Sequence, residues 1–176
     1  ALAADGGLGT GCSGAGVGGR CSLDGWNPDA GEHLWSRYMI PGPGEKGNAT
    51  WPKGDAYLRG GASTWITGSY DPELDLMYWG TGNAAPYNPE NRKGDNLYAA
   101  SIVALRPKTG EIVWHYQTVP NDIYDWDTVW EIILADINVD GKMRKVAMQM
   151  NRNGFLYVLD RITGELLSAK AFTQVN

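Results

Sequence analysis

Short alternating runs of apolar and polar residues, separated by polar turns, make up most of the chain. Three segments share one arrangement, a polar turn followed by Gly-Glu and an alternating run, at residues 27–35, 106–114 and 160–168. The turn before each glycine is a hairpin signal. Two of the turns follow runs rich in β-forming residues, 101–105 and 155–159. The pattern predicts strand–turn–strand units that recur with an aromatic anchor, as in the blades of a β-propeller.

The spacing of the repeated glycines indicates where loops interrupt these units. Gly31, Gly110 and Gly164 are separated by 79 and 54 residues, which exceeds a bare blade of about 40–50 residues. We therefore expect insertions at residues 39–55 and 84–96, which are rich in Pro, Gly and Asn. Residues 128–136 fit a short helix or a strand equally well. We expect an all-β chain of about four blades or fewer, forming one partial propeller domain over residues 1–176 with no separate second domain.

Composition excludes two classes of partner. The net charge is −5 and the chain has no basic run, which argues against a nucleic-acid binder, since such proteins carry a clustered basic face. No apolar stretch reaches the ~18 residues that a membrane span requires. The first four residues, Ala-Leu-Ala-Ala, are too few and uncharged to be a signal peptide. The 24 glycines suit many tight turns.

The only cysteines are Cys12 and Cys21. Two cysteines nine residues apart do not make a metal site. A disulfide between them would suit an oxidising compartment, but spacing alone does not establish its geometry. We expect the two cysteines to be unpaired. The two histidines, His33 and His115, each lie near an anchor tryptophan and are expected to be structural.

Two short segments carry candidate metal ligands. Asn83 follows the apolar run 76–79 and lies between Gly and Ala, so its side-chain oxygen could bind a cation or cap the next loop. Asp125 and Asp127 would lie on one face of a strand. Two close acids repel, and a cation between them relieves the repulsion; a solvated strand face is the alternative.

Two further residues carry candidate ligand contacts. Trp65 lies among glycines and small hydroxyl residues, a setting in which a flat aromatic ligand can stack on it. Arg152 lies in a glycine-containing turn, from which its planar fork can reach a carbonyl or a carboxylate. A surface arginine in a hairpin is the alternative.

In this order, segments 60–72, 80–83 and 123–127 resemble the pyrroloquinoline quinone (PQQ)-dependent alcohol dehydrogenases, and the resemblance runs from about Gly11 to Phe172. It implies an eight-bladed propeller, of which this chain would be an internal stretch. It also implies that Asn83 is a metal ligand and that Asp125 is both the catalytic base and a metal ligand. Asp127 matches the second acid of lanthanide-using members, whereas calcium-using members tend to lack an acid there.

The same resemblance implies a cofactor site. Trp65 matches the tryptophan beneath the PQQ ring, Arg152 matches an arginine that reaches the quinone oxygens, and Ser63 or Thr64 would hydrogen-bond to the edge of the ring. Residues 11–15 match the cofactor loop of the family, so the remaining implied contacts are Ser13, Gly14 and Ala15. The family then carries a metal-binding Glu where this chain has Gly16. The adjacent cysteine pair of the family is also missing.

The function implied by the resemblance is oxidation of an alcohol to an aldehyde or ketone. The bound calcium or lanthanide ion would polarise the quinone as a Lewis acid, Asp125 would take the hydroxyl proton, and hydride would pass to PQQ. Electrons would leave to a c-type cytochrome, and the protein would be periplasmic. Two alternatives stay open: a non-catalytic propeller that binds a partner, and an inactive fragment that has lost the metal-binding Glu.

Overall fold

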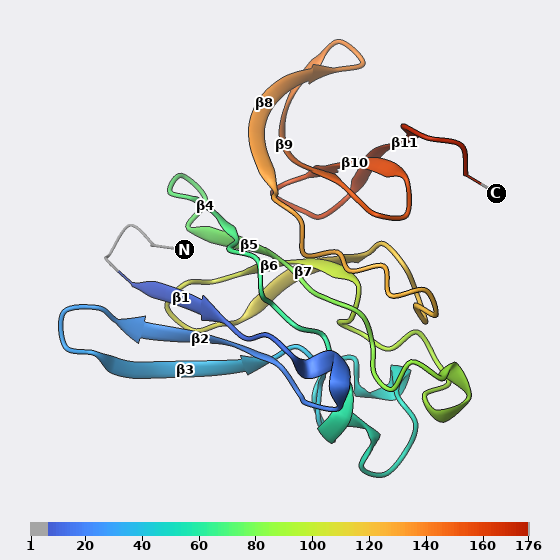
Figure 1. Ribbon diagram of the computed structural model, residues 1–176. Helices are drawn as coiled ribbons and strands as arrows, with labels where there is room; N and C mark the ends of the chain where they lie inside the picture. Colours follow the sequence, from blue (N-terminus) through green and yellow to red (C-terminus); the bar gives the residue numbers. More distant parts are fainter. Residues whose placement is uncertain (1–6, 176) are drawn as a thin grey trace.

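The computed structural model describes residues 7–175 as three antiparallel sheets that follow one another along the chain (Figure 1). The first sheet contains β1 (Leu8–Gly11), β2 (Ser22–Asn27) and β3 (Glu32–Tyr38). The second contains β4 (Ser69–Asp71), β5 (Leu76–Gly80), β6 (Ser101–Leu105) and β7 (Ile112–Gln117). The third contains β8 (Ile133–Val139), β9 (Lys142–Met150), β10 (Phe155–Asp160) and β11 (Leu166–Ala171). Within each sheet, strands that are consecutive in sequence are neighbours.

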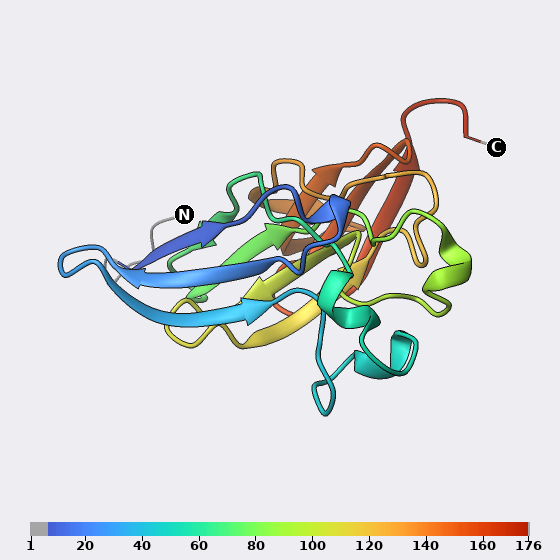
Figure 2. The same ribbon diagram turned by 60° about the horizontal axis from the view of Figure 1, so that its bottom comes forward.

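The sheets face one another like the blades of a propeller, which confirms the predicted fold class (Figure 2). The first strands of the second and third sheets, β4 and β8, contact each other, so the two sheets converge at that edge. Three sheets, one of them with three strands, are found within residues 7–175. This number agrees with the expectation of about four blades or fewer.

Long loops separate the strands where they were predicted. Residues 39–55 and 84–96 contain no strand, and they hold the short 3-10 helices η2 (Asn48–Thr50) and η4 (Pro89–Asn91). Two more 3-10 helices, η1 (Ala15–Val17) and η3 (Ala56–Arg59), lie in other loops. In segment 128–136 the strand alternative is correct, because β8 begins at Ile133. No helix within residues 7–175 has the length and apolarity needed to span a membrane.

The repeated Gly-Glu segments form the last hairpin of each sheet. Gly31, Gly110 and Gly164 have φ angles of 66°, 65° and 79°, a left-handed conformation that favours glycine. Each glycine N–H donates to the carbonyl oxygen of the residue four positions earlier, over 2.8 to 2.9 Å. In all three hairpins the strand register shifts by one residue next to the turn. The sequence repeat therefore encodes a repeated local structure.

A tryptophan on the last strand of one sheet packs on the turn glycine of the next sheet. The Trp35 ring lies so close to Gly110 that a side chain there would overlap it, and Trp35 Nε1 donates to the Pro107 carbonyl oxygen at 2.8 Å. Trp114 packs in the same way on Gly164 of the third sheet. These contacts fix the rotation of each sheet relative to the next one.

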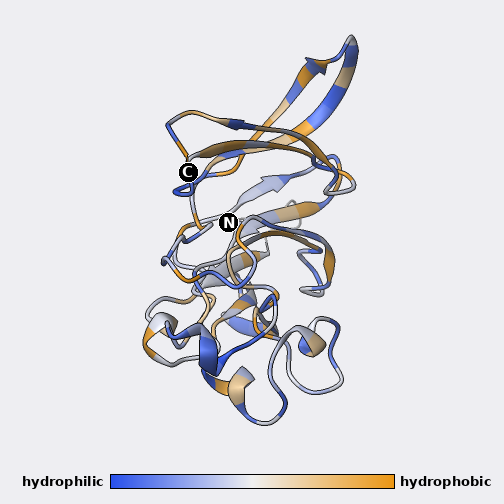
Figure 3. Cartoon of the chain, turned by 90° about the vertical axis from the view of Figure 1, so that its right-hand side faces the viewer, coloured by the Kyte–Doolittle hydropathy of each residue, from blue (hydrophilic) through white to orange (hydrophobic). Residues whose placement is uncertain are grey.

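The second sheet is covered on both faces, and all five residues of β5 and of β6 are buried. One apolar cluster fills the space toward the first sheet and includes Leu23, Trp79 and Val103. Another fills the space toward the third sheet and includes Tyr78 and Leu159. Figure 3 shows hydrophobic segments along the strands of these neighbouring sheets. Burial on both faces explains why β5 and β6 are continuous apolar runs rather than alternating ones.

Cys12 and Cys21 form a disulfide, with their Cα atoms 5.8 Å apart. The expectation that they are unpaired was therefore wrong. The reason lies in strand pairing: β1 runs antiparallel to β2, with Gly11 opposite Leu23, so the residues that flank the connecting loop are brought together. Cys21 is buried, and Cys12 is partly buried. The disulfide closes a loop that contains Ser13, Gly14 and Ala15.

Candidate functional site

The predicted site residues gather in the loops at one end of the sheets. These loops follow β1, β5, β7 and β9 and precede β4. In an antiparallel sheet alternate connections lie at the same end, so these segments meet although they are far apart in sequence. The opposite end holds the repeated Gly-Glu hairpins (Figure 1).

Backbone hydrogen bonds join three of these loops around Ser63 and Asn83. The N–H of Ala62 donates to the Asn83 carbonyl oxygen at 2.9 Å, and the N–H of Gly82 donates to the Ser63 carbonyl oxygen at 2.7 Å. The third loop joins through Ala15, whose N–H donates to Ser63 Oγ at 3.1 Å. The structure therefore brings the predicted cofactor loop, the Trp65 segment and the Asn83 segment together.

Thr64 holds the loop that follows β1 in place. Its buried hydroxyl accepts a hydrogen bond from the Cys12 N–H at 2.9 Å and donates its only proton to the Ser22 carbonyl oxygen at 3.0 Å. Its own N–H donates to the Cys12 carbonyl oxygen at 2.9 Å. Because the hydroxyl proton is already donated, Thr64 positions the loop, and Ser63 is the residue of the pair whose hydroxyl proton has no acceptor among residues 7–175.

Asn83 and Asp127 lie in direct contact. Asp127 Oδ1 accepts a hydrogen bond from the Asn83 N–H at 2.8 Å, and the Asn83 side-chain amide donates to the Ala84 carbonyl oxygen at 3.0 Å. Arg152 Nη1 lies 3.9 Å from Asp127 Oδ2. Burial and the nearby charge of Asp125 raise the pKa of Asp127, although the Asn83 N–H and Arg152 oppose the shift. A cation between Asp125 and Asp127 would remove this penalty.

Asp125 does not lie on a strand, so the expectation of two acids on one strand face was wrong. Residues 118–132 form an irregular loop between β7 and β8, and Asp125 has a φ of 61°. The loop, rather than a pleat, sets the orientation of the two carboxylates. Asp125 is partly exposed, whereas Asp127 is buried.

Trp65 and Arg152 both present side chains to solvent near this contact. Trp65 is 46% exposed, and its ring meets Trp130 edge to face with the ring centroids 6.3 Å apart. The Arg152 side chain is 45% exposed. It lies in the predicted turn between β9 and β10 and lines a cavity of about 720 Å³ together with Tyr124, Trp126 and Tyr157.

Gly16 faces the side chain of Asn83. A Cβ atom at this position would lie 3.3 Å from Asn83 Oδ1 and 3.7 Å from the Tyr87 hydroxyl oxygen. A carboxylate on residue 16 would therefore point at Asn83, but glycine supplies none. Within residues 7–175 no three His, Cys, Asp or Glu side chains gather as a metal site. Asn83, Asp125 and Asp127 supply oxygen donors of the kind that a hard cation binds. These residues therefore fit such an ion, with one carboxylate fewer than the family pattern that has Glu in place of Gly16.

Two residues near the site were not predicted from the sequence. The Tyr87 hydroxyl lies beside Gly16, and burial together with the charges of Asp125 and Asp127 raises its pKa. Asp122 is buried and lies in the same loop as Asp125. The only sequence signal for Asp122 was its place in a run of three closely spaced acids.

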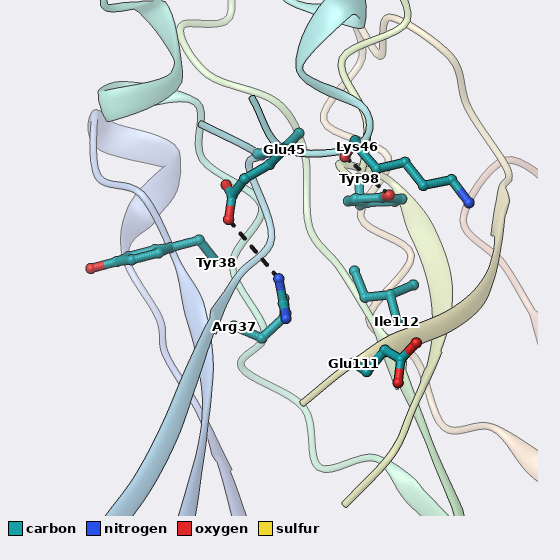
Figure 4. A pocket seen from close by; sticks show the side chains of 8 residues that line it. Arg37, Tyr38, Glu45, Lys46, Tyr98, Glu111 and Ile112 are labelled. Atoms are coloured by element: carbon teal, nitrogen blue, oxygen red, sulfur yellow. Dashed lines mark hydrogen bonds and ion pairs between the residues drawn. The ribbon is translucent and has the colours of Figure 1, made fainter. Parts of the chain in front are cut away.

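Another pocket lies between the end of β3, the loop that follows it, the β5–β6 loop and the start of β7, and it contains none of the predicted site residues. It is lined by charged and aromatic side chains that include Arg37, Glu45 and Tyr98 (Figure 4). Its Arg37–Glu45 ion pair is 4.0 Å long and partly exposed. Such a pair stabilises little, and the pocket has no contact with Asn83 or Asp127.

Comparison with known proteins agrees with this geometry. Residues 16–170 match the family model described as the glucose/ethanol/alcohol dehydrogenase, β-propeller domain, of the PQQ type. The chain belongs to this family. The quinohemoprotein alcohol dehydrogenase ADH IIB of Pseudomonas putida is 46% identical over 179 residues, which cover 94% of this chain and 26% of that protein. A lanthanide-dependent methanol dehydrogenase of Methylacidiphilum fumariolicum is 49% identical over 136 residues, which cover 77% of this chain and 22% of that protein.

Solved structures of PQQ family members have the same fold. The quinohemoprotein alcohol dehydrogenase ADHIIG of Pseudomonas putida HK5 superposes with a TM-score of 0.91 at 44% identity, covering 97% of this chain and 27% of that one. A europium-containing methanol dehydrogenase superposes with a TM-score of 0.89 at 39% identity, covering 97% of this chain and 33% of that one. The chain thus spans between about a quarter and a third of the length of these structures.

Proposed function

We propose that the native protein carrying this sequence oxidises an alcohol to an aldehyde or ketone, using PQQ and a bound calcium or lanthanide ion. The contact between Asn83 and Asp127 carries the proposal, because it joins two loops that supply oxygen donors beside the Ser13–Ala15 loop. When bound, PQQ would supply the redox chemistry and the cation its Lewis acidity.

The residues of this chain would divide the work as follows. Asn83, Asp125 and Asp127 would hold the cation. Asp125 would accept the hydroxyl proton at its carboxylate, since it is partly exposed and lies next to the buried acid.

The cofactor contacts would come from loops that the structure brings together. Trp65 would carry the ring on its exposed face, Arg152 would donate to carbonyl oxygens, and Ser63 would donate at the ring edge. The backbone of Ser13, Gly14 and Ala15 would complete this side, with Thr64 holding the loop in place.

A test uses the native protein freed of metal and cofactor. We expect PQQ to quench tryptophan fluorescence in the presence of calcium or lanthanum and to restore alcohol-dependent dye reduction. Asp125→Asn should still bind PQQ but lose turnover, because an amide cannot accept the proton. Asp140→Asn, at the exposed tip of the β8–β9 hairpin, is the matched control. Unchanged turnover in Asp125→Asn would remove it from the base role.

The glycine at position 16 favours a second candidate, a propeller that binds a partner without catalysis. A non-catalytic propeller has no need of the metal-binding carboxylate, and Gly16 supplies none beside Asn83. It predicts that neither PQQ nor a cation binds at micromolar concentration. Binding of both would exclude it.

We also infer a periplasmic location and a c-type cytochrome as electron acceptor. The Cys12–Cys21 disulfide supports an oxidising compartment, where such bonds persist. Cell fractionation tests the location. Reduction of a purified c-type cytochrome by the alcohol-treated protein tests the acceptor, and transfer only to artificial dyes would speak against it.

A further inference from the structure

Arg92 is a fully buried cation in the loop between β5 and β6, which also carries Asn83, and its guanidinium joins the Pro86–Tyr87 part of this loop to the loop between β7 and β8. Its Nε donates to the Pro86 carbonyl oxygen at 2.6 Å. Its Nη2 donates to the carbonyl oxygens of Tyr87, at 3.3 Å, and of Asp122. A buried charge is costly unless its hydrogen bonds are satisfied, and burial lowers the pKa of Arg92 while Asp122 opposes the shift. None of the roles assigned above uses this residue.

The acceptors of Arg92 belong to the two loops that carry the oxygen donors. Pro86 and Tyr87 lie three and four residues after Asn83, and Asp122 lies three residues before Asp125. The guanidinium therefore spans the distance between the Asn83 loop and the Asp125 loop. A second tie runs in parallel, because the Asn121 side-chain amide donates to the Arg92 carbonyl oxygen at 3.2 Å.

Asp122 extends the connection to the backbone around Asp125. Its Oδ1 accepts the Tyr124 N–H at 2.9 Å, and its Oδ2 accepts the Trp126 N–H at 2.7 Å. The carboxylate thus binds the residues on both sides of Asp125. Asp125 has a φ of 61°, which costs energy for a residue with a side chain and persists only where the surroundings hold it.

We propose that Arg92 and Asp122 form a clamp that positions Asp125 and Asp127 relative to Asn83. The clamp acts through the backbone, and both members are positioning residues that touch neither substrate nor cofactor. The proposal rests on the proposed function in taking Asp125 as the base and Asn83 and Asp127 as cation ligands. Outer residues that orient ligands in this way typically change affinity or activity by about 10- to 100-fold when they are replaced.

The first test is made on the native protein loaded with PQQ and lanthanum. Arg92→Ala should lower kcat and lanthanum affinity by about 10- to 100-fold with little change in the KM for alcohol. Millimolar methylguanidinium, which fits the space left by the side chain, should restore much of both, whereas methylammonium should not. The control, Arg106→Ala, removes an exposed arginine that also donates to backbone carbonyls, those of Leu74 and Asp75, and should change neither quantity.

The second test separates failure of the clamp from failure of the proposed function. Amide hydrogen exchange of the protein without cofactor reports the Tyr124 and Trp126 N–H groups directly. Arg92→Lys and Asp122→Asn, which keep side-chain volume, should speed exchange in residues 121–128 and leave β9 and β10 protected. Unchanged exchange there, or kcat and lanthanum affinity within twofold of the parent in a folded Arg92→Ala protein, would overturn the clamp. Faster exchange in a protein that binds no PQQ would overturn the proposed function and leave the clamp standing.

Discussion

Replacement of Arg161 by methionine should strongly destabilise the contact between the second and third sheets. Arg161 and Asp71 are 7% and 3% exposed, and Arg161 Nε donates to Asp71 Oδ2 at 2.6 Å. Arg161 also donates to Asp136 Oδ1 at 2.8 Å, but that carboxylate is half-exposed. The carbonyl oxygen of Arg161 accepts the Tyr78 hydroxyl at 2.8 Å, a bond that does not depend on its side chain.

The expected magnitude follows from the burial of Asp71. Its Oδ1 keeps the Glu73 N–H at 2.9 Å, but after Arg161→Met its Oδ2 retains no charged partner among residues 7–175, in a buried site. Breaking a buried pair in this way costs about 3–5 kcal/mol. The half-exposed Asp136 contact adds at most about 1 kcal/mol. We therefore expect a loss of about 3–5 kcal/mol in the free energy of unfolding.

Urea unfolding of the native protein, followed by tryptophan fluorescence, measures this loss. Arg161→Met combined with Asp71→Asn should recover about 2 kcal/mol or more, because the buried charge is removed while the amide oxygen still accepts the turn N–H groups. Arg106→Met, on the surface, should cost no more than about 0.5 kcal/mol. A loss in Arg161→Met close to that of the control, or strictly additive losses in the double variant, would refute the argument.

Three further outcomes are expected. Burial lowers the pKa of His115 from its ordinary value of 6.5. The unfolded chain therefore binds more protons, and the free energy of unfolding should fall as the pH drops below about 6.5. In urea unfolding at several pH values His115→Gln should flatten this slope, and an equal slope in the variant would show that His115 is not its source. Gly16→Glu should tighten lanthanum binding in calorimetry, because a side chain there points at Asn83; an unchanged affinity would mean that the new carboxylate does not reach the ion. Cys12→Ser should lower the free energy of unfolding by about 2–3 kcal/mol, the loop-closure effect of a disulfide over this short span. The double variant Cys12→Ser/Cys21→Ser should cost less than the sum of the two single variants, and strictly additive losses would argue against the Cys12–Cys21 pairing.

The sequence by itself determined the local structure. The turn glycines Gly31, Gly110 and Gly164 predicted the hairpins because a left-handed turn requires glycine whatever surrounds it. The apolar runs at β6 and β10 predicted strands for a similar reason, since strand preference depends on residue type. The family's motif order also brought Asn83, Asp125 and Asp127 into one hypothesis before any contact was known.

The tertiary structure decided how these pieces meet. Asp125 has a positive φ in an irregular loop rather than a place on a strand. The buried Arg92 and Asp122 belong to no periodic pattern that would predict their contacts. Cys12 and Cys21 pair because β1 and β2 run antiparallel. Trp35 reaches Gly110 only when two sheets stack. Each of these contacts joins residues that no local signal connects, so their positions depend on the packing of whole sheets and on the burial of charges between them.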